Sequence, residues 1–162
     1  MAITKTIPFP HKQYGMYPVE EDLRDAAYRG DAARIKALQT QYPHLNLNAP
    51  NEYGETAAYI ACKRKQGSTV EYLLQQPCID IKQSTILGNN CLLIAVWNDD
   101  TALAEKLVAK GADVYARTSP ERLYHGNVSA LDIAIERGNT ELVSFLKPLV
   151  ENQQAKPSSP LI

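Results

Sequence analysis

The sequence of 162 residues predicts an all-α solenoid of about four helix–turn–helix repeats joined by short β-hairpin loops. Three observations support this prediction. Apolar residues recur at fixed offsets along most of the chain, helix-breaking residues divide each unit into two short apolar stretches, and an extended segment follows the second stretch. Such a unit cannot bury its apolar side alone, so we expect successive units to stack.

The repeat is most visible in an alanine that recurs at spacings of 35, 34 and 39 residues, as Ala26, Ala61, Ala95 and Ala134. The positions three before, nine after and twelve after this alanine are also apolar in every unit. They hold Leu23, Ala58, Leu92 and Leu131, then Ile35, Val70, Ala104 and Val143, and finally Leu38, Leu73, Leu107 and Leu146. Chance rarely keeps four positions in such a register, which indicates a true internal repeat.

The stretch LLIAVWNDDTALAEKLVAKGADVYAR illustrates the elements of one unit. Leu92, Ala95 and Val96 share one face of a first helix because they stand at offsets three and four. The polar run 98–100 interrupts this helix, and a second apolar face then leads to Gly111, a residue that ends a helix easily. Helices of ~8–10 residues are too short to be stable alone, so each needs its neighbours.

These residues carry a family resemblance. The pattern Gly88-x-Asn90-x-Leu92-x-x-Ala95, followed by Leu107-Val108-x-x-Gly111-Ala112-Asp113-Val114, resembles the ankyrin repeat, whose period is ~33 residues. No unit has the Thr-Pro pair of that family or the His after its Leu, and the His place holds Arg24, Tyr59, Leu93 and Asp132. The alternative is an all-helical array of the tetratricopeptide kind, which leaves no place for extended segments at 46–48, 80–82 and 113–115.

The resemblance divides the chain into repeats of approximately 21–50, 51–84, 85–117 and 118–150. Residues 1–20 hold three prolines among aromatic residues, which predicts an extended arm that caps the first repeat or, alternatively, docks on a partner. The polar tail 151–162 carries Pro and Ser and is expected to be disordered. The longest spacing places an enlarged loop at 118–126, and insertions in repeat arrays often lie on the binding face.

Composition excludes several classes of protein. Seventeen basic and 18 acidic side chains leave a net charge of −1, which argues against binding to nucleic acid or an anionic membrane. Three cysteines without CxxC spacing suit a reducing compartment, and the N-terminus lacks the apolar run of a signal peptide. We therefore expect a cytoplasmic protein, and we expect a monomer.

The sequence contains little that indicates catalysis. Its three histidines stand far apart and pair with no Cys or carboxylate at metal-ligand spacing, and it has no GxGxxG, P-loop or GxSxG motif. We therefore expect no enzyme activity, no cofactor and no metal. A remaining alternative is an enzyme with a cryptic cysteine site, for which Cys78 and Cys91 are the candidates.

The resemblance also implies a partner-binding surface. In ankyrin proteins the two residues after the small positions of the first helix face a concave groove, and the hairpin tips face the same side. The corresponding residues here are Tyr28, Arg29, Glu52, Tyr53, Glu55, Lys63, Arg64, Ile86, Leu87, Trp97, Asn98, Tyr124, His125, Glu136 and Arg137, with Asn89 beside them. Trp97, the only tryptophan, is expected to be exposed in the groove, and the alternative is that it covers a seam between repeats.

The predicted function is therefore binding of another protein without catalysis. Trp97, Tyr53 and Tyr28 would be apolar anchors, because aromatic residues and Arg are enriched where binding energy concentrates. Acidic groups of the partner would contact the basic residues Arg29, Lys63, Arg64 and Arg137. Degenerate repeats of this kind resemble bacterial effectors secreted into a host, which would place the protein in the host cytosol. The alternative role is a bacterial inhibitor or immunity protein that blocks a toxin.

Overall fold

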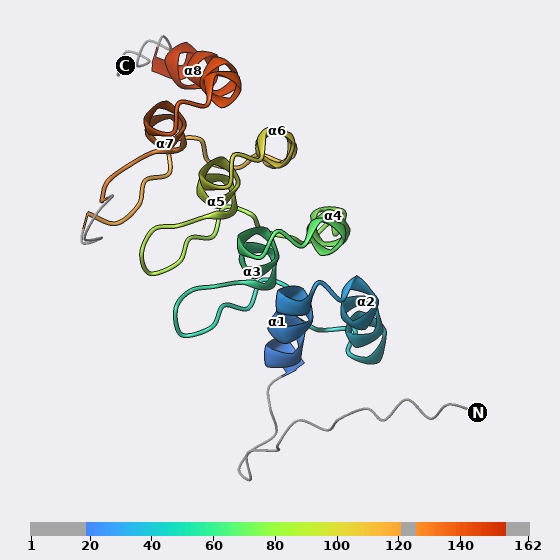
Figure 1. Ribbon diagram of the computed structural model, residues 1–162. Helices are drawn as coiled ribbons and strands as arrows, with labels where there is room; N and C mark the ends of the chain where they lie inside the picture. Colours follow the sequence, from blue (N-terminus) through green and yellow to red (C-terminus); the bar gives the residue numbers. More distant parts are fainter. Residues whose placement is uncertain (1–18, 121–125, 155–162) are drawn as a thin grey trace, which may run out of the picture.

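The computed structural model describes residues 19–120 and 126–154, with side chains as far as 151. Within these residues the chain forms eight helices. They are α1 (Val19–Arg29), α2 (Ala32–Gln41), α3 (Ala57–Lys63), α4 (Gly67–Leu74), α5 (Cys91–Trp97), α6 (Thr101–Ala109), α7 (Ala130–Glu136) and α8 (Thr140–Gln154). Consecutive helices pack as four pairs, and the pairs stack in chain order (Figure 1).

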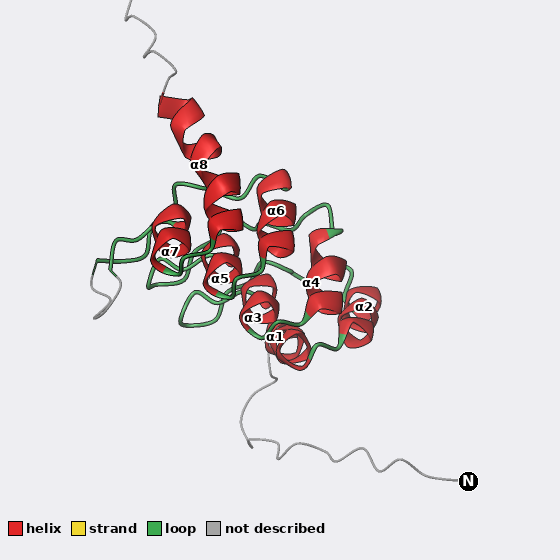
Figure 2. Ribbon diagram, turned by 45° about the horizontal axis from the view of Figure 1, so that its top comes forward, coloured by secondary structure: helices red, strands yellow, loops and turns green. Residues whose placement is uncertain are grey.

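The stack has two rows of helices and one row of loops. Figure 1 shows α1, α3, α5 and α7 in the inner row, α2, α4, α6 and α8 in the outer row, and the connecting loops projecting to one side of the inner row. Figure 2, coloured by secondary structure, shows the same rows without any strand. The predicted all-α solenoid of helix pairs is therefore confirmed. In the described residues the hairpin-like loops contain no named strand and one isolated bridge, between Arg117 and Ser129.

The core follows the repeat register. The four recurring alanines and the four leucines twelve residues later are all buried. The positions three before and nine after the alanine are buried in the first three pairs. In the last pair they hold Leu131 and Val143, which are partly exposed. The small alanine lets adjacent inner helices approach closely, and α1, α3, α5 and α7 pack successively against one another.

Polar side chains begin the inner helices at the position where the family usually has Thr. The side chains of Thr56, Asn90 and Ser129 each accept a hydrogen bond from the backbone N–H three residues later. These bonds satisfy donors that have no partner in the first turn of a helix. At α7 the Asp132 side chain also accepts a bond from the Ser129 backbone N–H, which completes a capping box.

The turn inside each pair uses a left-handed residue at one equivalent position. Gly30, Lys65, Asp99 and Gly138 have φ values of 78°, 57°, 58° and 69°. The residue after each of them donates its backbone N–H to the carbonyl of the recurring alanine at 2.9 or 3.0 Å. This shared geometry explains why glycine ends two of the inner helices and why Lys and Asp can replace it only with some backbone strain.

Two boundaries differ from the sequence-based expectation. Helix α1 begins at Val19, inside the expected arm, and α8 continues to Gln154, inside the segment 151–162 for which disorder was expected. Glu, Asn and Gln are compatible with helix, and Lys147 lies 3.9 Å from Glu151 one turn away. A polar composition therefore did not end α8 at residue 150. The remainder of the arm and of the tail lies outside the described residues.

Candidate functional site

A groove of about 640 Å³ lies between the loop tips and the inner helices. The loops before α3 and α5 form one wall, and the outward-facing residues of α3, α5 and α7 form the other. Its lining comprises Tyr53, Glu55, Tyr59, Lys63, Ile86, Leu87, Asn89, Leu93, Ile94, Trp97, Asn98 and Ile133. Backbone hydrogen bonds join consecutive loops, from Ile86 N–H to the Tyr53 carbonyl at 3.0 Å and from Ser119 N–H to the Leu87 carbonyl at 2.8 Å. These bonds hold the loop wall in place.

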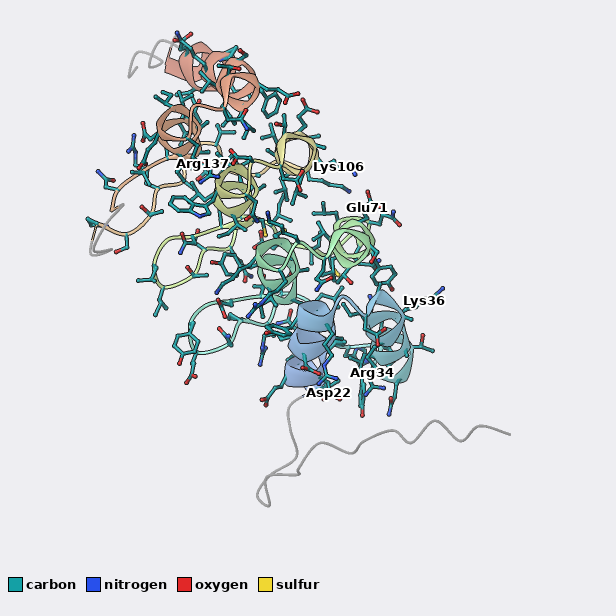
Figure 3. All side chains as sticks on the ribbon, viewed as in Figure 1. Asp22, Arg34, Lys36, Glu71, Lys106 and Arg137 are labelled. Carbon is teal, nitrogen blue, oxygen red and sulfur yellow. The ribbon has the colours of Figure 1, made fainter. Side chains whose placement is uncertain are left out.

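Trp97, the last residue of α5, lines the groove and is half-buried because it also packs against the core. The guanidinium carbon of Arg137 lies 5.6 Å from the centroid of its ring. Arg137 Nε in turn donates to both carboxylate oxygens of Asp99, at 3.1 and 3.0 Å. Figure 3 shows Arg137 between α5 and α7 on the side of the loops. The sequence left two alternatives for Trp97, exposure in the groove and coverage of a seam between repeats. In the structure its side chain does both.

Asp99 is held ionised by this contact. The Arg137 guanidinium, helped by a 3.3 Å hydrogen bond from Asn139, lowers the pKa of the Asp99 carboxyl below its ordinary value. Hydrogen bonds to the charged form and a nearby opposite charge both favour ionisation. The pair therefore remains charged at neutral pH, and Arg137 is fixed over the tryptophan.

The charges that line the groove are paired with each other. Lys63 Nζ lies 2.7 Å from Glu55 Oε1, and Asn51 donates to the other carboxylate oxygen of Glu55 at 3.1 Å. Burial raises the pKa of Glu55, but the bonds from Lys63 and Asn51 outweigh it, and the pKa lies below its ordinary value. The groove therefore offers polar and apolar surface in similar amounts, with one neutralised ion pair.

The loop tips expose the apolar side chains that the sequence placed there. Ile86 is 67% exposed, Tyr53 56% and Leu87 43%, and all three line the groove. Large apolar side chains clustered in a concave site are typical of binding surfaces. Glu52, beside Tyr53, is exposed at its loop tip but does not line the groove.

Other predicted residues lie on the neighbouring inner surface of the stack. Arg64 lies over the ring of Tyr28, with 4.0 Å between the guanidinium carbon and the ring centroid. Arg29 forms an ion pair with Asp25 at 2.9 Å. Glu136 is exposed at the end of α7. The two remaining predicted residues, Tyr124 and His125, lie outside the described residues.

Four groove residues were missing from the sequence-based set. Tyr59, Leu93 and Ile133 stand four residues before Lys63, Trp97 and Arg137, so they share a helix face with residues already identified. Ile94 follows Leu93. The i, i+4 relation would have found the first three. Tyr59 and Leu93 stood out in the sequence only as the residues at the family's His place, and the structure buries most of all three side chains.

Two of the three cysteines lie together inside the core of the described residues. Cys62 and Cys91 are buried in contact, and a hydrogen bond to the Cys91 thiol, together with burial, raises the pKa of Cys62 well above its ordinary value. An activated thiol has a lowered pKa, so Cys62 has the opposite property. No three His, Cys, Asp or Glu residues of the described ranges cluster as metal ligands. None of the described helices is both long and apolar enough to cross a bilayer.

Comparison with known proteins agrees with this architecture. A family model described as ankyrin repeats (3 copies) matches residues 23–118, which is more than half of the chain. The match begins inside α1, at Leu23, and covers the chain to Thr118, beyond α6, whereas α7 and α8 lie outside it. No curated protein matches the sequence. The fourth helix pair is thus identified by its register and packing alone.

Proposed function

Because the chain belongs to the ankyrin repeat family, whose repeats generally mediate protein–protein interaction, we propose that it binds a partner protein in the groove beside Trp97. Domains of this family are typically non-catalytic, and the proposal includes no reaction. The observation that carries it is that the exposed loop-tip residues Ile86 and Leu87 and the half-buried Trp97 line one groove.

The chemistry of the groove favours an apolar segment of the partner. Lys63 and Glu55 already neutralise each other, so a charged group entering the groove would lose water without gaining an unpaired counter-charge. An apolar side chain would instead bury surface against Trp97, Ile86 and Leu87. The loop wall is held by backbone hydrogen bonds, which reduces the ordering that binding requires.

An acidic group of the partner would meet Arg64 more readily than the other basic residues. Arg29, Lys63 and Arg137 each have a carboxylate partner within the chain. Within the described residues, Arg64 has no carboxylate in salt-bridge distance and stacks on Tyr28. A segment with an apolar anchor followed by an acidic residue would therefore fit the groove and its rim.

For the biological role, we propose that the partner is a host protein and that the chain acts as a secreted bacterial effector in the host cytosol. The support is the resemblance of its degenerate repeats to those of effectors. The alternative, an inhibitor or immunity protein, requires a toxin as partner. The identity of the captured partner distinguishes the roles, since an effector retains a eukaryotic protein and an immunity protein retains a toxin encoded next to it.

The test is affinity capture from host and bacterial lysates with matched baits. We expect Trp97→Ala to weaken binding by about 2 kcal/mol or more. Since Trp97 is half-buried, the exposed loop-tip variant Ile86→Asp provides an independent test with little expected effect on folding. Partner retention that is equal with wild type, Trp97→Ala and Ile86→Asp baits would refute the groove as the binding site.

A pair of tyrosines supplies the control. Tyr53 at the loop tip and Tyr42 at the end of α2 are 56% and 42% exposed, but only Tyr53 lines the groove. Tyr53→Ala should weaken retention of the partner, and Tyr42→Ala should leave it unchanged. Equal losses from both variants would indicate a general surface effect in place of a specific groove.

Thiol reactivity tests the alternative of an enzyme with a cryptic cysteine site. Cys78 is exposed, whereas Cys62 and Cys91 are buried. In the native protein we expect one thiol to react at an ordinary rate and two to react only after unfolding. A thiol that reacts much faster than free cysteine would support the enzyme alternative.

A further inference from the structure

The two ends of the stack have opposite chemistry at equivalent positions. Each helix pair turns one face toward the pair that follows. Between the second and third pairs, Cys62 of this face meets Cys91, and Val70 lies beside Leu103. The corresponding positions of the last pair define the C-terminal face, which consists of Leu131, Ile135, Val143 and Lys147.

The C-terminal face leaves exposed what the other pairs bury. Ile135 is 58% exposed, while the equivalent residues of the first three pairs, Ala27, Cys62 and Val96, are at most 2% exposed. Leu131 and Val143 are also partly exposed at positions that are buried in every other pair. Nothing in the described residues stacks on this end, as Figure 1 shows beyond α7 and α8. The last pair therefore presents an apolar stripe where the fold would otherwise add another layer.

The first pair, in contrast, closes its own end with charge. Asp22, Asp25 and Arg34 define the N-terminal face, and Arg34 lies 3.2 Å from Asp22 (Figure 3). Their side chains are exposed. Asp22 stands where the later pairs have Ala57, Cys91 and Ala130. Asp25 stands where they have Ile60, Ile94 and Ile133. Arg34 stands where they have Thr69, Leu103 and Leu142. Terminal repeats need a polar outer surface to be soluble, and the first pair meets this requirement.

Head-to-tail stacking of copies is therefore disfavoured. In the register of the internal pairs, where Cys62 meets Cys91, Ile135 of one copy would press on Asp22 of the next. Removing that carboxylate and its Arg34 partner from water against an apolar side chain carries a large desolvation penalty. When a second copy covers the C-terminal face with its own C-terminal face, both copies bury the same apolar stripe, and the interface closes about a two-fold axis.

The charges around the C-terminal face suit such a pairing. Glu136 lies at the end of α7, and Lys147 lies on α8 with its side chain 60% exposed and only a 3.9 Å contact to Glu151 of the same helix. A two-fold axis that sets α7 of one copy opposite α8 of the other brings acidic and basic groups together across an apolar centre. We propose that the C-terminal face is a homodimer interface that joins two stacks end to end through Leu131, Ile135 and Val143. This inference concerns a different surface from the groove and departs from the monomer expected from the sequence.

Sedimentation velocity over a range of protein concentration tests this interface. A face two helices wide is smaller than a standard interface, so we expect a dimer with micromolar affinity, visible between roughly 1 and 500 µM. Ile135→Arg should raise the dimer dissociation constant by at least about tenfold. The control Ile86→Arg, at a more exposed isoleucine of the groove, should dimerise as the wild type does.

The outcomes separate clearly. Wild-type protein that stays monomeric over the whole range overturns the proposal, and so does a dimer that Ile135→Arg leaves intact. Growth beyond the dimer also overturns it, because that growth requires the charged N-terminal face. If Ile135→Arg does not fold, as judged by circular dichroism, Lys147→Glu provides the second variant, and it should weaken the dimer because it sets acidic groups against Glu136.

Cross-linking gives an independent measurement. In a Cys78→Ser background, whose remaining thiols are buried, a mixture of the Ile135→Cys and Val143→Cys variants should form a dimer linked by a disulfide from α7 of one copy to α8 of the other, under mild oxidation by diamide. Two thiols lose two protons and two electrons to diamide, which is reduced to the hydrazine. Ile86→Cys in the same background should cross-link at least about tenfold more slowly. Its thiols meet only by chance collision, whereas thiols held at the interface have a high effective concentration. Equal rates would contradict a specific two-fold interface.

Discussion

The guanidinium of Arg137 lies over the indole ring of Trp97, 5.6 Å from its centroid, although the two residues belong to different helix pairs. The same relation exists between Arg64 and Tyr28, at 4.0 Å, in the first two pairs. In each case the arginine stands three residues after the recurring alanine of its own pair. The aromatic residue stands two residues after the recurring alanine of the preceding pair. The inner surface of the stack is thus linked between repeats by cations over aromatic rings.

Removal of the Arg137 side chain should expose one side of the tryptophan. We expect Arg137→Gln to shift the Trp97 emission to longer wavelength and to increase its quenching by acrylamide, because water replaces the guanidinium over the ring. Trp97 is the only tryptophan, so the signal has one source. Arg117→Gln, which breaks an ion pair with Asp132 instead, serves as control and should leave the emission unchanged.

Acid should release the same contact at a defined point. Since the pKa of Asp99 is lowered in the folded protein, its ion pair with Arg137 stabilises the fold fully above the ordinary aspartate pKa. That stabilisation is lost as the pH falls through the lowered value. We expect a change in Trp97 emission below the ordinary aspartate range, absent in Asp99→Asn. If the midpoint of the emission change lies at or above the ordinary aspartate range while the circular dichroism is still native, the change does not come from the Asp99–Arg137 ion pair.

The left-handed turn position predicts opposite effects of two substitutions. Gly138 has φ of 69° and open space around its α-carbon, so Gly138→Ala should cost about 1–2 kcal/mol of unfolding free energy through backbone strain alone. Lys65 occupies the equivalent position at φ of 57°. Lys65→Gly relieves similar strain but adds freedom to the unfolded chain, so its effect should lie between zero and a gain of about 1 kcal/mol. Urea unfolding measures both, and a clear destabilisation by Lys65→Gly would be inconsistent with this account.

The close stacking of the loops gives another matched pair of substitutions. A methyl group at Gly88 would lie 2.7 Å from the Arg117 carbonyl oxygen and 2.7 Å from the Ser119 nitrogen, while one at Gly111 would meet nothing within 4 Å. Both glycines have positive φ. Gly111→Ala should therefore cost about 1–2 kcal/mol, and Gly88→Ala about 2–5 kcal/mol because a steric clash adds to the strain. Equal costs in urea unfolding would show that the loops can move apart.

Most of the fold could be predicted from local patterns. The spacing of Ala26, Ala61, Ala95 and Ala134 located all four inner helices, because a helix that buries one face shows a period of 3.6 residues in its sequence. The polar run 98–100 located the turn between α5 and α6. Local sequence did not locate the end of α8, since polar residues such as Glu151 are compatible with both helix and tail.

The candidate site was predicted only in part. Tyr53, Lys63, Ile86, Leu87 and Trp97 were placed on the groove side, where the structure has them. Their partners were not predicted, because Lys63 and Glu55, or Arg137 and Asp99, become neighbours only when the chain has folded. A basic residue that looks available in the sequence can therefore already be paired in the protein.

What the sequence alone determined is the repeat: its register, its helix pairs and the side on which the loops project, since these depend on interactions within a few residues of each other. The tertiary structure decided which residues of that register are available to a partner. Trp97 is half-buried because the core and Arg137 of the next pair both contact it, and Ile135 is exposed because no helix pair of the described residues stacks on it. Exposure depends on what stacks on a residue, and stacking brings together residues that are more than thirty positions apart.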